Sequence, residues 1–371
     1  MSGPGRAARG CRGGVVLLVT LIACTAAPPI TDLSQELAAA GLAAELADPV
    51  LPDAAMRAWA RQTVRASQAP EERLAGLLHA LLRRPEAPLR HRGGTTTTVQ
   101  EAWASGTANC LTFTHLFVRL AREVGVDAYY LRIREATGFD REGDLVVITD
   151  HVVAAAGTSA QRTLIDLSAR PLRDFATVER IGDRRALALH YSNLGAEAIR
   201  AGDVALAGER LAIATRLDAD LADGWVNLGV ARRRSGDFAG AEAAYRRALA
   251  VDPEQVSALH NLAALLERLG RGAEARALLA AVDASSLRSP WSALALGGIA
   301  MRGGRLEEAG RFLRRAQRLL PESAEPWAAL GEWALARGDR QRARRYAEAA
   351  LRREPGHPGA TNLLRRIEPA P

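Results

Sequence analysis

The feature that most constrains the fold of this chain is a spacing of 34 residues that runs through its second half. At this interval a leucine recurs, followed each time by glycine or alanine, and a later glycine and an alanine recur in step with it. The recurring positions are Leu194, Leu228, Leu262, Leu296 and Leu330; Gly202, Gly236, Gly270, Gly304 and Gly338; and Ala207, Ala241, Ala275, Ala309 and Ala343. A chain built in this way buries its apolar surface between neighbouring repeats, so an array is predicted over about residues 188 to 355.

The residue types at these positions indicate that each repeat is a pair of antiparallel helices. Small residues after the leucine and in the alanine column allow two helices to approach closely, and the mid-repeat glycine suits the turn between them. Tryptophan stands three residues before the leucine in two repeats, and proline ends three of them: Trp225, Trp327, Pro253, Pro321 and Pro355. With these residues the pattern resembles the tetratricopeptide repeat. The resemblance implies an all-α solenoid of five repeats over residues 188–371, with a capping helix over residues 357–368.

The resemblance also implies a partner, because such arrays bind peptides or proteins on their concave face. We expect a peptide or an envelope protein there; a spacer or a dimer surface is the alternative. The third repeat departs from the pattern at its end, where Val282 and Leu287 replace the small residue and the proline of its neighbours. A local irregularity is therefore predicted between Asp283 and Pro290.

The first 23 residues have the pattern of an export signal. Three arginines precede an apolar run over residues 15–23 that is too short to span a bilayer. The run ends in Leu-Ile-Ala-Cys24, which resembles the bacterial lipobox, and this implies that Cys24 carries the lipid anchor. Thr25 is not the aspartate associated with inner-membrane retention, so in a Gram-negative source the resemblance implies the periplasmic face of the outer membrane. Ordinary cleavage near Ala27 is the alternative.

Cysteine usage and charge narrow the classes of function. Of three cysteines, Cys11 leaves with the signal and Cys24 carries lipid, so Cys110 is the remaining thiol and an internal disulfide is excluded. All 49 basic residues are arginine, and the net charge of +7 falls to +4 without the three arginines of the signal. This gives little support for nucleic acid as a partner. The arginine doublets 314–315, 344–345 and 352–353 are interpreted as solvated helix faces.

The segment before the repeats begins with helices and reaches a candidate nucleophile. Residues 24–94 are interpreted as the anchor segment and N-terminal helices, without a chemical motif. Asn109 is a good N-cap, which places Cys110 in the first turn of a helix that Gly125 ends; Cys110, Phe113, Phe117, Leu120 and Val124 form its buried stripe. Free amide groups and the helix dipole favour the thiolate at that position.

Two strands after this helix carry a histidine and an aspartate. Strands are predicted over residues 145–156 and 162–167. If their hairpin closes on Thr158 and Ser159, His151 and Asp166 form a direct cross-strand pair, the geometry in which an aspartate orients an imidazole. A cysteine that opens a helix, followed by His and Asp on consecutive strands, resembles the transglutaminase-like superfamily of papain-like fold. This resemblance implies an α+β domain over residues 95–187 with Cys110, His151 and Asp166 as catalytic residues.

The implied activity is thiol acyl transfer on a peptide or protein, by a cysteine hydrolase, protease or acyltransferase. Trp103, or the backbone N–H of Cys110, is a candidate oxyanion donor. No cofactor is expected, and no metal, because paired His or Cys ligands are missing from the sequence. The sequence departs from many members of the superfamily at Val152, where an aromatic residue is common. The alternatives are an inert buried thiol at Cys110 and, for the whole chain, an inactive envelope adaptor that binds its partner through the repeats.

Overall fold

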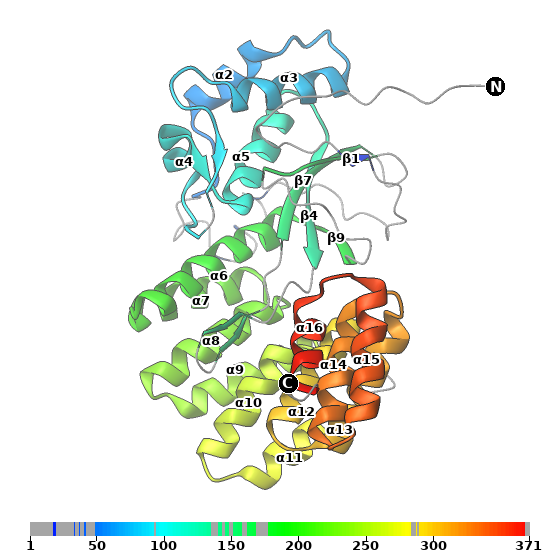
Figure 1. The fold of residues 1–371 in the computed structure, drawn as a ribbon. Coiled ribbons are helices and arrows are strands. Elements are labelled where there is room, and N and C mark those ends of the chain that lie inside the picture. Colours follow the sequence, from blue (N-terminus) through cyan, green and yellow to red (C-terminus); the bar gives the residue numbers. More distant parts are fainter. Residues whose placement is uncertain are drawn as a thin grey trace, which may run out of the picture. The chain divides into compact units, whose positions relative to one another are not determined.

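A computed structural model gives the fold of the chain in two compact units (Figure 1). The N-terminal unit comprises residues 1–135 and 149–227, and the C-terminal unit comprises residues 136–148 and 228–371. The structure describes residues 18–19, 33, 37, 41, 49–92, 94–134, 140–142, 145–147, 151–157, 162–167, 177–282, 287 and 289–367. Cys24 lies outside the described residues. Among the described helices, none is both long enough and apolar enough to cross a bilayer.

Short helices begin the N-terminal unit, as the sequence predicts. They are α2 (Ala54–Thr63), α3 (Pro70–Leu82) and α4 (Val99–Ser105), followed by α5 (Cys110–Glu123), with a parallel pair of two-residue strands, β2 (Arg90–His91) and β3 (Thr107–Ala108). Asp53 caps α2, and Pro70 occupies the first turn of α3, where its missing N–H costs nothing. Leu74, Leu77, Leu78 and Leu81 of α3 are buried, and Leu82 is partly buried. Gly125, in a left-handed conformation with φ of 71°, follows the end of α5.

A five-stranded sheet packs against α5. Its order is β1-β8-β7-β4-β9, and every neighbouring pair is antiparallel. The strands are β1 (Leu18–Val19), β4 (Ala128–Arg134), β7 (His151–Gly157), β8 (Arg162–Ile165) and β9 (Thr177–Ile181). Val152, Ala154 and Ala156 share a core with α5, whereas Val153 and Ala155 belong to the core on the other side of the sheet. Strand β1 lies within the expected signal peptide, so a processed chain would lack it.

The register of the hairpin corrects the predicted pairing of His151 with Asp166. Ala154 pairs with Ile165 and Gly157 pairs with Arg162, two residues away from the register expected for closure on Thr158 and Ser159. The pairing runs from Ala154 to Gly157 on β7 and from Arg162 to Ile165 on β8, and residues 158–161 lie outside the described residues. Continued by one residue, this register sets Asp166 opposite Val153, diagonal to His151. The single strand predicted over residues 145–156 is also divided: Leu145–Val147 forms β6, which pairs with β5 (Asp140–Glu142).

Helix pairs follow the sheet at the predicted interval. They are α6 (Asp183–Ala201) with α7 (Val204–Leu217), α8 (Ala222–Ser235) with α9 (Phe238–Val251), α10 (Val256–Arg268) with α11 (Gly272–Ala280), α12 (Pro290–Arg302) with α13 (Leu306–Leu319), and α14 (Ala324–Ala336) with α15 (Arg340–Arg353). The predicted capping helix is α16 (Pro358–Ile367). Helix α11 has nine residues where the other second helices have 14, which agrees with the irregular end predicted for the third repeat.

The glycine after the repeated leucine sits where a neighbouring side chain leaves no space. A Cβ atom built on Gly229 would lie 2.4 Å from Cε1 of Tyr245, and one on Gly297 would lie 2.5 Å from Cδ2 of Leu313. Each neighbour belongs to the second helix of the same repeat. The predicted role of the small residue, close approach of two helices, is therefore confirmed at these positions.

We expect the substitution Gly229→Ala to lower the free energy of unfolding by about 1–3 kcal/mol, the usual range for overpacking a tight interface. The buried Tyr245 ring would have to move to admit the added methyl group. A Cβ atom added to Gly208, in α7, would meet no neighbouring atom within 4 Å, so Gly208→Ala is the control and should be neutral or slightly stabilising. Urea unfolding of both variants measures this difference, and equal midpoints would contradict the packing argument.

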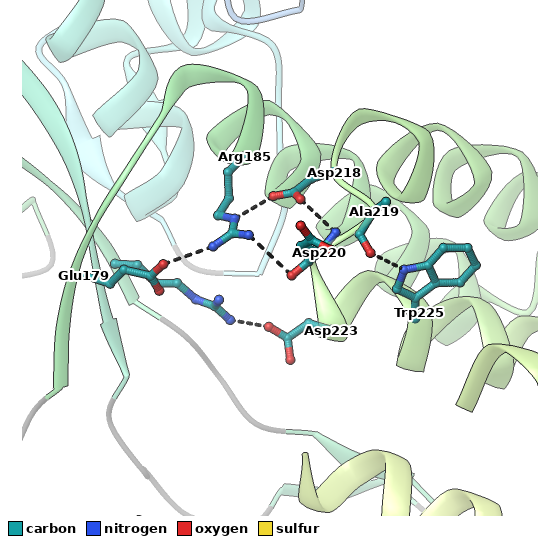
Figure 2. A network of polar contacts seen from close by, with 8 residues as sticks. Glu179, Arg185, Asp218, Ala219, Asp220, Asp223 and Trp225 are labelled. Carbon is teal, nitrogen blue, oxygen red and sulfur yellow. Dashed lines mark hydrogen bonds and ion pairs between the residues drawn. The ribbon is translucent and has the colours of Figure 1, made fainter. Parts of the chain in front are cut away.

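A network of charged side chains attaches the first repeat to the sheet (Figure 2). The Arg185 guanidinium donates from Nε to Oδ2 of Asp218 at 2.5 Å and from Nη1 to Oε1 of Glu179 on β9 at 3.0 Å. Arg132 of β4, whose side chain is 3% exposed, forms an ion pair with Asp223 at the start of α8. The domain boundary expected after residue 187 falls inside α6. The charged network joins residues before this boundary to residues after it, and all of them belong to the N-terminal unit.

Candidate active site at the start of helix α5

Helix α5 begins at Cys110, the candidate nucleophile, and Asn109 caps it as predicted. Oδ1 of Asn109 accepts a hydrogen bond from the backbone N–H of Thr112 at 2.7 Å. Helix geometry gives the amides of Cys110 and Leu111, the first two of the helix, no acceptor within the helix. The Cys110 side chain is half-buried. A thiol at this position has amide donors and the positive end of the helix dipole beside it.

A threonine-rich loop holds the cap in place. Nδ2 of the buried Asn109 side chain donates to Oγ1 of Thr96 at 3.0 Å, and the Thr96 amide donates to Oε1 of Glu197 on α6 at 2.8 Å. The hydroxyl of Thr112 donates to the carbonyl oxygen of Thr97 at 3.0 Å. The sequence alone assigns this loop no role. Its role depends on Glu197, some hundred residues away in the chain, and no local pattern indicates that contact.

Thr114 joins the start of α5 to the start of β7. Its Oγ1 lies 2.7 Å from the carbonyl oxygen of Cys110 and 3.1 Å from the carbonyl oxygen of Val152. The single hydroxyl proton serves one acceptor at a time, so the two carbonyl groups compete for it. This side chain fixes the backbone of the candidate nucleophile next to the residue that follows His151.

The backbones of the three predicted catalytic residues meet at one end of the sheet. His151 is the first residue of β7 and pairs with Ile133, near the end of β4. Since β8 runs antiparallel to β7, its final residue, Ile165, lies beside the beginning of β7, and Asp166 follows directly. The Asp166 side chain is half-buried. The His151 side chain lies outside the described residues, so the predicted approach of its ring to the Cys110 sulfur stays a prediction.

Trp103, the candidate oxyanion donor, packs within the N-terminal helices. The guanidinium carbon of Arg84 lies 3.5 Å from the Trp103 ring centroid, and the Trp59 ring meets it edge-on at a centroid distance of 5.0 Å. Nη1 of Arg84 also donates to the Trp103 carbonyl oxygen at 3.0 Å. These contacts give the ring a packing role, and its oxyanion role stays a prediction.

A second group of polar side chains lies buried along α5. Nδ1 of His115 is 3.1 Å from the Tyr130 hydroxyl, and the ring of His190 on α6 meets the His115 ring at a centroid distance of 5.7 Å. Burial lowers the pKa of His115 well below its ordinary value and that of His190 to about 4, and it raises the pKa of Tyr130 to about 12. All three are therefore neutral near pH 7 and pack as part of the core.

A family model confirms the class of the repeats. The tetratricopeptide repeat family matches residues 232–292, within the array that the 34-residue spacing predicts. The C-terminal part of the chain therefore consists of tetratricopeptide repeats, a class that binds proteins. No curated protein sequence matches this chain.

Several solved structures are similar to part of this chain. PilF of Pseudomonas aeruginosa is 21% identical with a TM-score of 0.34, over 50% of this chain and 84% of PilF. YrrB, described as a tetratricopeptide repeat protein with an unusual peptide-binding site, is 18% identical with a TM-score of 0.32, over 48% of this chain and 92% of YrrB. A MamA fragment from Desulfovibrio magneticus RS-1 is 21% identical with a TM-score of 0.32, over 48% of this chain and 98% of the fragment.

Proposed function

We propose that the chain is a thiol acyl-transfer enzyme of transglutaminase-like type, with a papain-like α+β domain whose nucleophile is Cys110 and repeats that bind a protein. The observation that carries this proposal is the bridge made by Thr114. It sets the first residue of α5 beside the first residues of β7, where His151 stands. Thiol catalysis needs a nucleophile at such a position and a base that reaches its proton. Side chains alternate along β7, and Val153 lies on the face of the sheet away from α5, so the proposal requires the His151 ring to reach Cys110 around the end of the strand.

The proposed chemistry runs through a thioester. His151 takes the proton of the Cys110 thiol, and the sulfur attacks the carbonyl carbon of an amide. The carbon–nitrogen bond breaks, and the amine leaves with the proton returned by the imidazolium. Water or a second amine then attacks the thioester carbon, the carbon–sulfur bond breaks, and the thiol is restored. Asp166 acts by holding the imidazole, and the N–H groups at the start of α5 stabilise the oxyanion.

The test uses a chain that begins at residue 28, in which Cys110 is the single cysteine. With p-nitrophenyl acetate, we expect a burst of about one equivalent of p-nitrophenolate and an acetyl group on the Cys110 peptide by mass spectrometry. Hydroxylamine added after the burst should cleave the thioester and accept the acetyl group. Cys110→Ser should lose the burst, and His151→Gln should slow it by at least about a hundredfold. Equal acetylation of the wild type and Cys110→Ser would reject the catalytic proposal and leave the adaptor function, in which the repeats alone act.

We also propose that the protein is exported and anchored through Cys24. The apolar run before Cys24 and the lipobox-like residues at its end support this proposal. An acyl chain contributes about 0.8 kcal/mol per buried methylene, so loss of the acylated thiol should release the protein. We expect Cys24→Ala to move the protein from the membrane fraction to the soluble fraction of the source bacterium. Membrane association equal to that of the wild type would contradict the anchor.

A further inference from the structure

The fifth repeat has a pocket lined by arginine and aromatic side chains. Its volume is about 400 Å³, and it opens between α14 and α15. The residues that give it its chemistry are Trp327, Arg342, Arg345, Tyr346, Arg352 and Arg353. All of them belong to the C-terminal unit, whereas Cys110 and the five-stranded sheet belong to the N-terminal unit.

The floor of the pocket is aromatic and held in place. The Trp327 and Tyr346 rings have centroids 6.1 Å apart, and the guanidinium carbon of Arg353 lies 4.3 Å from the Trp327 ring centroid. Arg353 donates from Nε to the carbonyl oxygen of Pro321 at 2.6 Å and from Nη1 to that of Ala349 at 2.8 Å. Its position is thus fixed, and it forms a wall of the pocket.

Two arginine side chains at the rim of the pocket have guanidinium N–H groups that can donate to a ligand. Arg345 and Arg352 are exposed, and neither forms an ion pair within the part of the chain that the structure describes. Arg342 differs, because its Nε lies 3.4 Å from Oδ2 of Asp339. Helix α15 contains six arginines against one acidic residue, Glu348, so the surface around the pocket is strongly positive.

Comparison with the second repeat of the array shows that the arginines of the pocket are not required to build the fold. Trp225 is the counterpart of Trp327, and each indole Nε1 donates to a backbone carbonyl oxygen six residues earlier at 2.9 Å. The tryptophan therefore has the same structural role in both repeats. The counterparts of Arg342, Arg345, Arg352 and Arg353 in the second repeat are Gly240, Ala243, Ala250 and Val251. The fifth repeat has gained positive charge around an otherwise shared tryptophan.

We propose that this pocket binds an acidic, extended segment of a protein partner. Arg345 and Arg352 are seven residues apart on one helix, which is about 10 Å along its axis. In the polyproline II conformation three residues cover about 9 Å and bring residues i and i+3 to the same face, so two carboxylates three residues apart reach both guanidinium groups. An apolar or aromatic side chain between them then packs against Tyr346 and the edge of the Trp327 ring, one face of which Arg353 covers. The proposal names the partner chemistry of the repeats and does not depend on catalysis at Cys110.

Isothermal titration calorimetry of the chain from residue 28 with the peptide acetyl-GSEFAESG-amide tests the proposal. We expect saturable binding that Arg345→Ala and Arg352→Ala each weaken about tenfold, the loss of one charge-assisted contact. Arg344→Ala is the matched control, since it removes one charge from the same helix outside the pocket, and its affinity should stay within about twofold of the wild type. The peptide with glutamine in place of both glutamates should bind at least about tenfold more weakly.

Other outcomes overturn the proposal. An affinity weaker than about 1 mM, or equal weakening by Arg344→Ala and Arg345→Ala, would mean that the pocket does not recognise the acidic segment. Tighter binding of inorganic phosphate, RNA or vesicles of anionic phospholipid than of the peptide would assign the surface to those ligands instead. Cys110→Ser should bind the peptide like the wild type, so failure of the acyl-transfer proposal and failure of this one are distinguishable.

Discussion

A chain that ends at residue 187 is expected to lose cooperative folding. Leu189, Tyr191 and Leu217, which such a chain lacks, are buried in the same core as α5. Burial of each such side chain stabilises the fold by about 1.5–3 kcal/mol. The total free energy of unfolding of a domain is about 5–15 kcal/mol, so the loss of several of these side chains removes a large part of it. The cut also removes Glu197, which holds the loop over the start of α5. Thermal unfolding followed by circular dichroism measures the loss.

The control is a chain that ends at Ser235, the last residue of α8. It keeps the whole N-terminal unit and the charged network around Arg185, so it should unfold in one cooperative transition once its exposed apolar residues are replaced by polar ones. A sharp transition in the chain that ends at residue 187 would show that the first repeat is dispensable for the α+β core.

The second large effect is expected at Asp223. The substitution Asp223→Ala removes a carboxylate from the buried Arg132 guanidinium, and breaking a buried pair in this way costs about 3 kcal/mol or more. Glu209→Ala, on the exposed face of α7, removes the same charge and should change the free energy of unfolding by less than about 0.5 kcal/mol. The double variant Arg132→Met with Asp223→Ala should recover part of the loss, because no buried charge remains. Urea unfolding of the N-terminal unit measures these values, and equal effects of Asp223→Ala and Glu209→Ala would contradict the argument.

The repeats could be predicted almost completely from the sequence, and the reason is physical. Each repeat places the same small residue against the second helix of its own pair, so packing constraints appear in the sequence at a fixed period. Gly229 and Gly297 show this directly, because a Cβ atom at either position would overlap Tyr245 or Leu313. The turn glycines of the five repeats all have φ between 71° and 86°, a conformation that favours glycine.

The candidate site could be predicted only in part. Asn109 and Cys110 are neighbours in sequence, so the capped helix start follows from local rules. The observed hairpin register pairs Ala154 with Ile165 and Gly157 with Arg162, and no local pattern distinguishes it from the register expected for closure on Thr158 and Ser159. The contact of Glu197 with Thr96 and the pair of Arg132 with Asp223 join segments about a hundred residues apart, and periodicity within one segment carries no information on such contacts.

The rate at which Cys110 reacts with iodoacetamide, measured against pH, tests the central claim most directly. In the chain from residue 28 the alkylated residue is unambiguous, since no other cysteine remains. An activated thiol should already react rapidly at pH 6–7, below the ordinary thiol pKa of about 8.5, and His151→Gln should shift that reactivity toward higher pH. A wild-type rate that is negligible below about pH 8, or a pH profile unchanged by His151→Gln, would contradict the assignment of Cys110 as a nucleophile activated by His151.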